Sequence, residues 1–189
     1  MSKIKIKISN KTAEVYAPYH KDFIEKIKYI GGAKWNGYNQ CWCVPIDTID
    51  AVRIILKKVF GYDDLEFPET LKIKVTIKED VYEDKNDIFL LGKCLCHASG
   101  KNSGGKPGED VAYVEGYPTS GGSASNWYSL IRAGSVIILN NVNKSLYDSY
   151  NKSSEYDLEI IDNNNRDKLL LEKEWLLKRL AEIESLLTD

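Results

Sequence analysis

Histidine is scarce in this chain: among its 189 residues only His20 and His97 are present. A paired histidine acid–base system would therefore require these two distant residues to meet in the fold. Long apolar runs are also missing, because none approaches the ~18 consecutive residues of a membrane-spanning helix. Residues 1–5 are basic but are not followed by the apolar segment of a secretory signal. We expect a cytoplasmic protein with no membrane partner.

Cysteine is sparse as well, and the four cysteines form two Cys-x-Cys pairs, Cys41/Cys43 and Cys94/Cys96. On a strand, residues i and i+2 point to the same side, so each pair could chelate a metal ion. Structural zinc sites, however, usually separate their cysteines by about two to four residues. A cytoplasmic chain keeps such thiols reduced. We expect half-buried thiols with no metal and no cofactor, and zinc at these four cysteines is the alternative.

A large net charge is missing too, but the value of −2 hides an uneven distribution. Residues 1–61 carry 11 Lys or Arg against 5 Asp or Glu, whereas residues 62–162 carry 10 against 17. The basic segment suits a polyanion. The acidic segment suits a basic protein partner, or simply solubility.

The first 61 residues show alternating strand and helix patterns. Residues 3–8 alternate lysine and isoleucine, which predicts a strand with one apolar face and one lysine face. Residues 12–17 return as a second strand, and residues 19–31 follow a helical period that ends at two glycines. Asn36-Gly37 between two aromatic-bearing segments predicts a hairpin, and a second helix ends at Gly61. These signals predict a ββαββα domain over residues 1–61.

The remainder predicts a β domain and a terminal helix, so the fold class is α+β. Residues 62–70 form an acidic linker, and strand-like runs follow at 71–78, 88–96, 111–117, 135–140 and 156–161. Loops rather than helices separate these runs, which favours a small five-stranded barrel or sandwich over residues 71–162. The last segment, 163–189, contains a helix over residues 166–188 with Leu169, Leu176 and Ile183 every seven residues. This helix could pack on the barrel, or pair with a second copy or another partner.

Residues 15–61 resemble the HARP domain, a DNA-binding module found beside the motor of annealing helicases. The resemblance rests on Tyr-Ala-Pro-Tyr at 16–19, Ile-Gly-Gly-Ala-Lys-Trp-Asn at 30–36, Cys-Trp-Cys-Val-Pro at 41–45, and Phe-Gly at 60–61. The family's Gly/Pro-Ala-x-Trp-Asp/Asn and Trp-x-x-Pro signatures both have counterparts here. The resemblance implies DNA binding, with a preference for branched DNA in the helicases. The chain has no helicase motor, so ATP-driven remodelling is not implied.

The residues expected to contact nucleic acid, DNA rather than RNA, combine lysines for phosphates with aromatic rings for base stacking. They are Lys3, Lys5, Lys7, Lys11, Lys34, Trp35, Tyr38, Lys57 and Lys58. The alternative is that Trp35 belongs to the core and that the lysines only protect a strand edge from aggregation. We assign Trp42 to the core, because it lies between strand residues beside Pro45.

These features predict a non-enzymatic nucleic-acid-binding protein of a phage or other mobile element. In its sharpest form it is an inhibitor of a host nucleic-acid-processing complex, an anti-CRISPR-like protein that acts on a Cas effector in the bacterial cytoplasm. Residues that could hold such a protein partner are Trp127, Asp80, Glu83, Asp84, Leu176, Leu180 and Ile183. A homodimer through residues 166–188 is a further option.

Two other function classes stay open. One is a small nuclease centred on His97 and the glycine-rich loops of residues 97–127. The other is a purely protein-binding structural factor. Residues 100–106 nearly match a phosphate-binding P-loop, but Pro107 stands where a Ser or Thr would hold magnesium. We therefore do not expect nucleotide hydrolysis.

Overall fold

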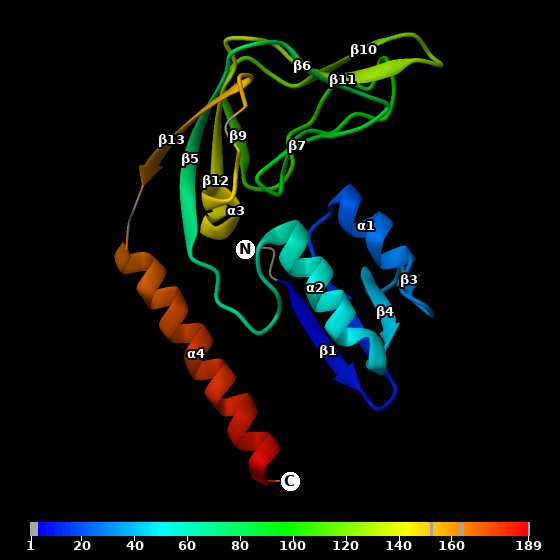
Figure 1. Ribbon diagram of the computed structural model, residues 1–189, viewed down its shortest axis with the longest axis vertical. Coiled ribbons are helices and arrows are strands. Elements are labelled where there is room, and N and C mark those ends of the chain that lie inside the picture. The colour runs from blue at the N-terminus through cyan, green and yellow to red at the C-terminus, as the bar shows by residue number, and fades with distance from the viewer. Residues whose placement is uncertain (1–3, 152, 163–164, 189) are drawn as a thin grey trace.

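The computed structural model describes residues 4–151, 153–162 and 165–188, and it confirms the α+β class. Its buried apolar residues form two separate clusters, one between Ile4 and Phe60 and the other between Leu71 and Val142. Figure 1 shows the two corresponding halves, with the terminal helix α4 (Asn165–Thr188) reaching down beside the N-terminal half.

The N-terminal half has the predicted order of two strands, a helix, two strands and a helix. Its four strands form one antiparallel sheet in the order β1-β2-β4-β3. The elements are β1 (Lys5–Ser9), β2 (Thr12–Tyr16), α1 (Lys21–Lys28), β3 (Lys34–Asn36), β4 (Cys41–Pro45), the 3-10 turn η1 (Ile46–Thr48) and α2 (Ile49–Phe60).

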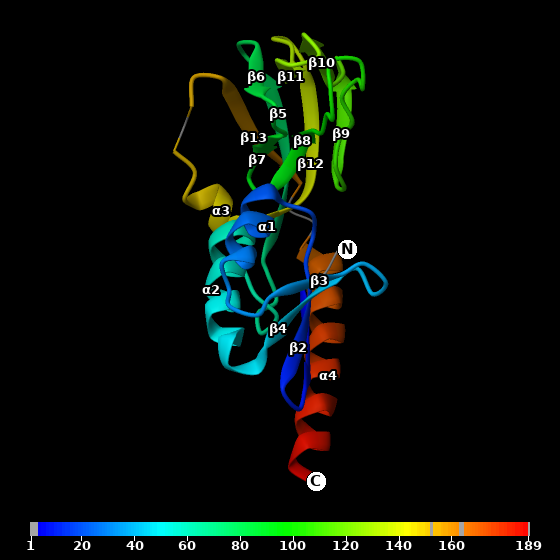
Figure 2. The same ribbon diagram turned by 90° about the vertical axis from the view of Figure 1, so that its right-hand side faces the viewer.

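Both helices cover the same face of this sheet. Strand alternation places Val15 and Val44 on the covered face, where they are buried with Phe23 of α1 and Leu56 of α2. Trp42 is 8% exposed and belongs to the same cluster, which confirms its assignment to the core. Figure 2 shows α1 and α2 on one side of the strands and the tip of the β3–β4 hairpin projecting on the other side. The second face of the sheet is therefore left open.

The second half consists mainly of short antiparallel strands. Its strand orders are β13-β5-β12-β9, β10-β11-β6 and β7-β8. The elements are β5 (Thr70–Ile77), β6 (Val81–Asp84), β7 (Ile88–Leu90), β8 (Lys93–Cys96), β9 (Val111–Glu115), β10 (Thr119–Gly122), β11 (Trp127–Ile131), β12 (Val136–Asn143), α3 (Lys144–Asp148) and β13 (Tyr156–Asp162).

The predicted number of five strands in this half was wrong, since nine strands are present among its described residues. The run at 88–96 is divided into a hairpin, because Leu91 and Gly92 both adopt a positive φ. The acidic segment after residue 80 and the glycine-rich segment at 119–122 both pair with β11. Backbone pairing with a partner strand thus overrides the weak strand propensity of acidic residues and glycine.

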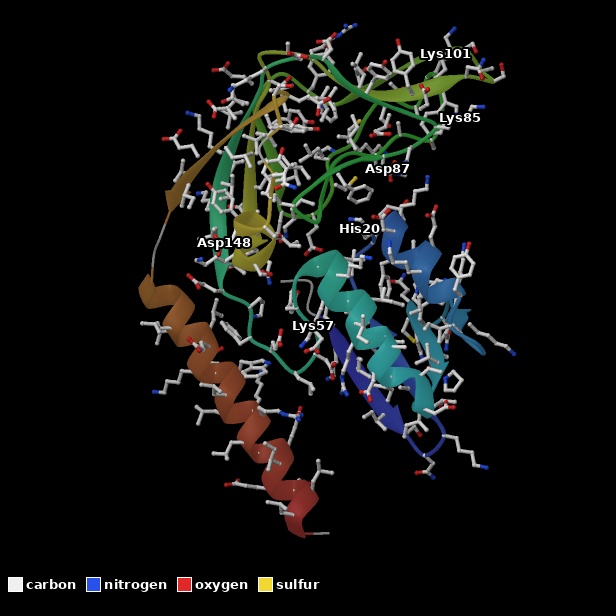
Figure 3. The ribbon with its side chains drawn as sticks, in the orientation of Figure 1. His20, Lys57, Lys85, Asp87, Lys101 and Asp148 are labelled. Atoms are coloured by element: carbon white, nitrogen blue, oxygen red, sulfur yellow. The ribbon has the colours of Figure 1, made fainter. Side chains whose placement is uncertain are left out.

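The two halves meet through aromatic and polar contacts. The ring of His20, which precedes α1, lies 4.1 Å from the ring of Phe89 in β7, and Figure 3 shows His20 on the side of the second half where Asp87, just before β7, lies. Gly61 ends α2 with a φ of 82°, and its carbonyl accepts a hydrogen bond from Ser145 Oγ of α3. Across the described ranges, no helix has the length and apolar character needed to cross a membrane.

Candidate nucleic-acid interface

The open face of the N-terminal sheet is built from the side chains that alternate with the core residues. One row crosses all four strands, because Lys7 pairs with Glu14, Glu14 with Cys43, and Cys43 with Lys34. A neighbouring row contains the pairs Lys5–Tyr16 and Asn36–Cys41. Hereafter "the open sheet face" means these eight residues. It thus has lysines on its two outer strands and a carboxylate, a phenol and two thiols on its inner strands.

The inner strands hold the one carboxylate of this face in a defined position. Tyr16 donates its hydroxyl hydrogen to Glu14 Oε2 at 2.8 Å, and Asn39 Nδ2 donates to Glu14 Oε1 at 3.0 Å. Both bonds lower the pKa of Glu14, and the bond from Tyr16 has the larger effect. The bond between Tyr16 and Glu14 also raises the pKa of Tyr16. Lys7 Nζ lies 4.9 Å from the centre of the Tyr16 ring, a cation–π contact. Glu14 is therefore held in a fixed orientation, with its pKa below the ordinary value.

Positive charge in this half divides between the helices and the sheet. On the helices Lys21, Lys26, Arg53 and Lys57 all form ion pairs with carboxylates. The acidic linker supplies several of these carboxylates, since Arg53 makes two bonds to Asp64, of 2.9 and 3.1 Å. Among the described residues, the exposed sheet lysines Lys5, Lys7 and Lys34 and the turn lysine Lys11 have no such ion pair. On the described helices of this half, Lys28 and Lys58 also lack an ion pair, so unpaired positive charge is greatest on the sheet and its first turn but is not confined to them.

The β3–β4 hairpin adds exposed aromatic rings. Trp35 is 55% exposed, although its ring lies 5.6 Å from that of Trp42. Tyr38 at the tip is 97% exposed. Asn36 Oδ1 accepts hydrogen bonds from the backbone N–H groups of Tyr38 and Asn39, which fixes the turn. The hairpin therefore presents aromatic surface at the edge of the sheet, where it is not absorbed into the core.

The predicted nucleic-acid residues do not all share one surface. Lys5, Lys7 and Lys34 lie together on the open sheet face, and Lys3 lies outside the described residues. Lys57 lies on the side of α2 next to the linker (Figure 3) and contacts Asp63 and Glu66. Lys58 is exposed on α2, so the helical layer separates it from the open sheet face. Sequence reasoning missed Tyr29, which is 90% exposed just after α1; no periodic signal marks such a residue.

No protein-family model, curated protein or solved structure matches this chain. What the open sheet face can bind therefore follows from its own geometry and charge. Unpaired lysines on a strand edge suit the phosphates of a nucleic acid, and exposed rings suit its bases.

His97, the residue of the nuclease alternative, lies at a separate place in the second half. Its Nδ1 lies 2.9 Å from Oδ1 and 3.0 Å from Oδ2 of the buried Asp87. Because a carboxylate only accepts, Nδ1 carries the hydrogen and Nε2 is left as the basic nitrogen of the neutral ring. Tyr19 packs its ring 6.1 Å from His97, and partial burial beside Asp87 raises the pKa of Tyr19 to about 12. His97 and His20 thus flank the junction of the two halves without forming a hydrogen-bonded pair.

The predicted partner residues occupy two distant regions. Asp80 is tied to Arg132 and to the backbone of Ala133, while Glu83 and Asp84 are exposed on β6. These acidic residues lie at the far end of the molecule from α4 (Figure 1). Trp127, at the start of β11, is partly buried. Glycine-rich β10 pairs with that strand, so the loop around Trp127 is partly ordered by the sheet.

Helix α4 leaves most of its apolar side chains in solvent. Leu176, Leu180 and Ile183 are 53%, 53% and 41% exposed. Trp175, on another side of the helix, packs its ring 5.8 Å from Phe67 of the linker. A cavity of about 950 Å³ lies beside this contact, and Leu169, Tyr62 and His97 are among its lining residues. The helix is thus attached to the linker through Trp175, and its Leu176–Leu180–Ile183 stripe is unpartnered in a single chain.

The four cysteines do not form one cluster. Cys41, which is buried, and Cys43, which is half-buried, lie on β4 of the N-terminal sheet, whereas Cys94 and Cys96 are both buried in the second half. Burial raises the pKa of the Cys94 thiol to about 12 and also raises that of Cys96. The two pairs belong to different sheets, so any zinc bound by these cysteines would have to be held by one pair together with other ligands.

Proposed function

We propose that this chain is a non-enzymatic nucleic-acid-binding protein that holds a phosphate backbone on its open sheet face. The observation that supports this most is the division of charge: the cations of the helices are mostly paired with carboxylates, while Lys5, Lys7 and Lys34 are not. Lysine binds phosphate as a mobile point charge and reads no base sequence. Binding would therefore depend strongly on salt and weakly on sequence.

The hairpin aromatics add a second kind of contact at the edge of the sheet, beside the open sheet face. Tyr38 and Trp35 can stack on bases that are unpaired or frayed, and stacking of this kind is worth about 1–3 kcal/mol per base. Branched or partly single-stranded DNA offers phosphates and unpaired bases together. The resemblance of residues 15–61 to the HARP domain supports the same preference and favours DNA over RNA.

The second half and α4 supply surfaces for a protein partner. Acidic Glu83 and Asp84 are exposed on β6 and the apolar Leu176–Leu180–Ile183 stripe is exposed on α4, toward the other end of the molecule. An acidic surface can compete for the basic nucleic-acid channel of a host complex. We therefore place the protein in the bacterial cytoplasm as a mobile-element factor, in its sharpest form an anti-CRISPR-like inhibitor of a Cas effector.

Fluorescence anisotropy with labelled oligonucleotides tests the binding proposal. Branched DNA, single-stranded DNA, duplex DNA and RNA of equal length are each titrated with the full chain. The proposal expects the tightest binding to branched or single-stranded DNA and weaker binding by the Tyr38→Ala variant. No binding to any of the four at low salt would overturn it.

A nuclease is the second candidate, and the Asp87–His97 pair is the observation that favours it. A buried carboxylate that orients an imidazole is a recurrent general-base arrangement. Across the described part of the chain, however, no hydrogen bond joins His97 to a serine or cysteine that it could activate. Incubation of labelled DNA and RNA with and without magnesium separates the two functions. Cleavage that is lost in His97→Ala would establish the nuclease, and intact substrates would support binding alone.

A further inference from the structure

The centre of the open sheet face brings together three side chains that can ligate a metal ion. Glu14 of β2 is the register partner of Cys43 of β4, and Cys41 lies two residues before Cys43 on the same strand. One carboxylate oxygen of Glu14 and the two sulfur atoms all lie within 4.8 Å of one another. Among the described residues, no other set of three or more His, Cys, Asp or Glu side chains brings its ligand atoms this close together.

We propose that Glu14, Cys41 and Cys43 bind a thiophilic divalent cation of the Zn²⁺ type. Two thiolates and one carboxylate are ligands that zinc accepts, and three protein ligands leave a fourth position for solvent. Thiolates disfavour the hard cations Mg²⁺ and Ca²⁺, which prefer ligand sets made of oxygen. The carboxylate in turn disfavours Cu⁺, whose preferred ligands are soft sulfur atoms.

The backbone favours this metal over a disulfide between the same cysteines. In an extended strand, residues i and i+2 are about 6.6–7.2 Å apart at Cα, whereas disulfides cluster near about 5.5–6 Å. Their side chains leave the same face roughly in parallel, so the sulfur atoms cannot reach bonding distance unless β4 bends. A metal ion between the sulfur atoms requires no such bend. Cys41 and Cys43 thus have the geometry of a chelating pair.

Hydrogen bonds from neighbouring residues already orient the carboxylate. Tyr16 donates to one oxygen of Glu14 and Asn39 donates to the other. Each carboxylate oxygen has two lone pairs, so each keeps one for a cation. Partners that hold a ligand in this way are typical of metal sites and affect affinity roughly 10–100-fold. Tyr16 and Asn39 would therefore act as positioning residues for Glu14.

Binding changes the protonation of the thiols but not the charge of the face. The two thiols each release one proton to solvent as their sulfur atoms bond to the dication, and no electrons are transferred. Two negative charges on sulfur then balance the two positive charges of the ion. The open sheet face keeps the net charge it has with neutral thiols. Metal occupancy and attraction of phosphates by Lys5, Lys7 and Lys34 are thus separable properties.

The second Cys-x-Cys pair offers an internal comparison. Cys94 and Cys96 have the same spacing and are buried, as Cys41 is, but Cys96 Sγ donates to the carbonyl of Thr119 at 3.4 Å. This pair does not belong to a three-ligand group in the portion of the chain that the structure describes. The same spacing therefore does not create a second site.

Titration of the reduced full chain with Co²⁺, a spectroscopic stand-in for Zn²⁺, tests the site without any nucleic acid. We expect one Co²⁺ per chain, a thiolate-to-cobalt charge-transfer band, and displacement of cobalt by Zn²⁺ with release of the band. Cys43→Ser should lose the band, and Glu14→Gln, at a half-buried position, should weaken binding at least roughly tenfold. Cys94→Ser is the matched control and should bind cobalt like the wild type.

A circular dichroism spectrum of each variant checks that the chain is folded. Absence of the charge-transfer band in the wild type would overturn the site, and so would a band that persists in a folded Cys43→Ser variant. A band lost equally in Cys94→Ser would assign the metal to the other pair and overturn it as well. Because no nucleic acid is present, none of these results bears on the proposed DNA binding.

Discussion

The ring of Trp35 lies 5.6 Å from the ring of Trp42, yet 55% of Trp35 is exposed and only 8% of Trp42. The two residues are register partners on β3 and β4. Trp42 therefore completes the core, and Trp35 covers Trp42 from the outside at the edge of the sheet. The pair marks the place where the core of the N-terminal half reaches the molecular surface.

Replacement of each tryptophan by alanine should separate these two roles. Trp42→Ala removes a buried ring and should lower the free energy of unfolding by about 3–5 kcal/mol. Trp35→Ala should lower it much less, because half of its surface is already in water, but it should weaken DNA binding. Urea denaturation measures the first quantity and anisotropy the second. Equal losses of stability would contradict the assignment.

His20 makes stability depend on pH. Its Nδ1 accepts a hydrogen bond from Asp22 N at the start of α1, and burial lowers its pKa below the ordinary value of 6.5. The unfolded chain therefore binds a proton at a higher pH than the folded chain does. Well above pH 6.5, His20 is neutral in both the folded and the unfolded chain, so its titration does not change stability there. As the pH falls below 6.5, stability is lost until the folded-state pKa is passed.

His20→Asn tests this effect, because asparagine keeps a capping oxygen but does not titrate. The variant should be less stable at neutral pH, since it loses the ring contact with Phe89. Its loss of stability between about pH 7 and pH 5 should be smaller than that of the wild type. Thermal unfolding over this range measures both. A pH dependence identical to that of the wild type would contradict the role of His20.

Much of the N-terminal half could be predicted from sequence, because its signals are local. The alternation of residues 3–8, the Asn36-Gly37 turn and the glycine after each helix correctly indicate strands, a hairpin and helix ends. The second half was predicted less well. Strand β10 contains Gly121 and Gly122 and is a strand because it pairs with β11. Such pairing is a tertiary property that local propensity does not encode.

Gly61 connects the two halves and should tolerate no side chain. Its φ is 82°, and a Cβ there would lie 2.7 Å from Ser145 Oγ and 2.8 Å from Asn143 Cγ. Gly134 has a φ of 84° but nothing within 4 Å of such a Cβ. Gly134→Ala should therefore cost only the backbone term of about 1–2 kcal/mol. Gly61→Ala should cost more in the same denaturation experiment, and equal costs would show that its contact with α3 is unimportant.

The exposed stripe of α4 should promote self-association. Leu169, Leu176 and Ile183 repeat every seven residues, with Leu180 and Leu187 four residues after the last two of them. Leu176→Lys combined with Leu180→Lys should shift the chain toward monomer without lowering its unfolding midpoint. Sedimentation velocity over a range of concentrations measures this.

Ala181→Lys adds the same kind of charge on a different side of α4 and is the control for that variant. It should leave the association unchanged. A wild-type chain that stays monomeric at every concentration would contradict pairing with a second copy. The stripe would then be left for a different protein partner.

The candidate interface could be predicted only in part. The lysine face of the first strand follows from alternation alone, so Lys5 and Lys7 were predicted correctly as residues of an exposed face. The ion pairs of Lys57 with Asp63 and Glu66 join α2 to the linker, and no local pattern encodes them. The approach of Glu14 to Cys43 likewise depends on the register of β2 and β4. Sequence therefore indicates the charge of this surface, and only the fold indicates which charges remain unpaired.

The salt dependence of DNA affinity shows whether the open sheet face binds phosphates. For duplex DNA, the slope of log affinity against log salt changes by about 0.9 for each phosphate contact that is lost. The Lys5→Gln, Lys7→Gln, Lys34→Gln variant should therefore bind weakly and with a clearly flatter slope. A control with the same charge change, Lys78→Gln, Lys85→Gln, Lys101→Gln, alters exposed lysines of the other half, two of which are labelled in Figure 3. We predict that the control keeps the wild-type slope. A wild-type slope in the sheet variant, or a flattened slope in the control alone, would contradict nucleic-acid binding by the open sheet face.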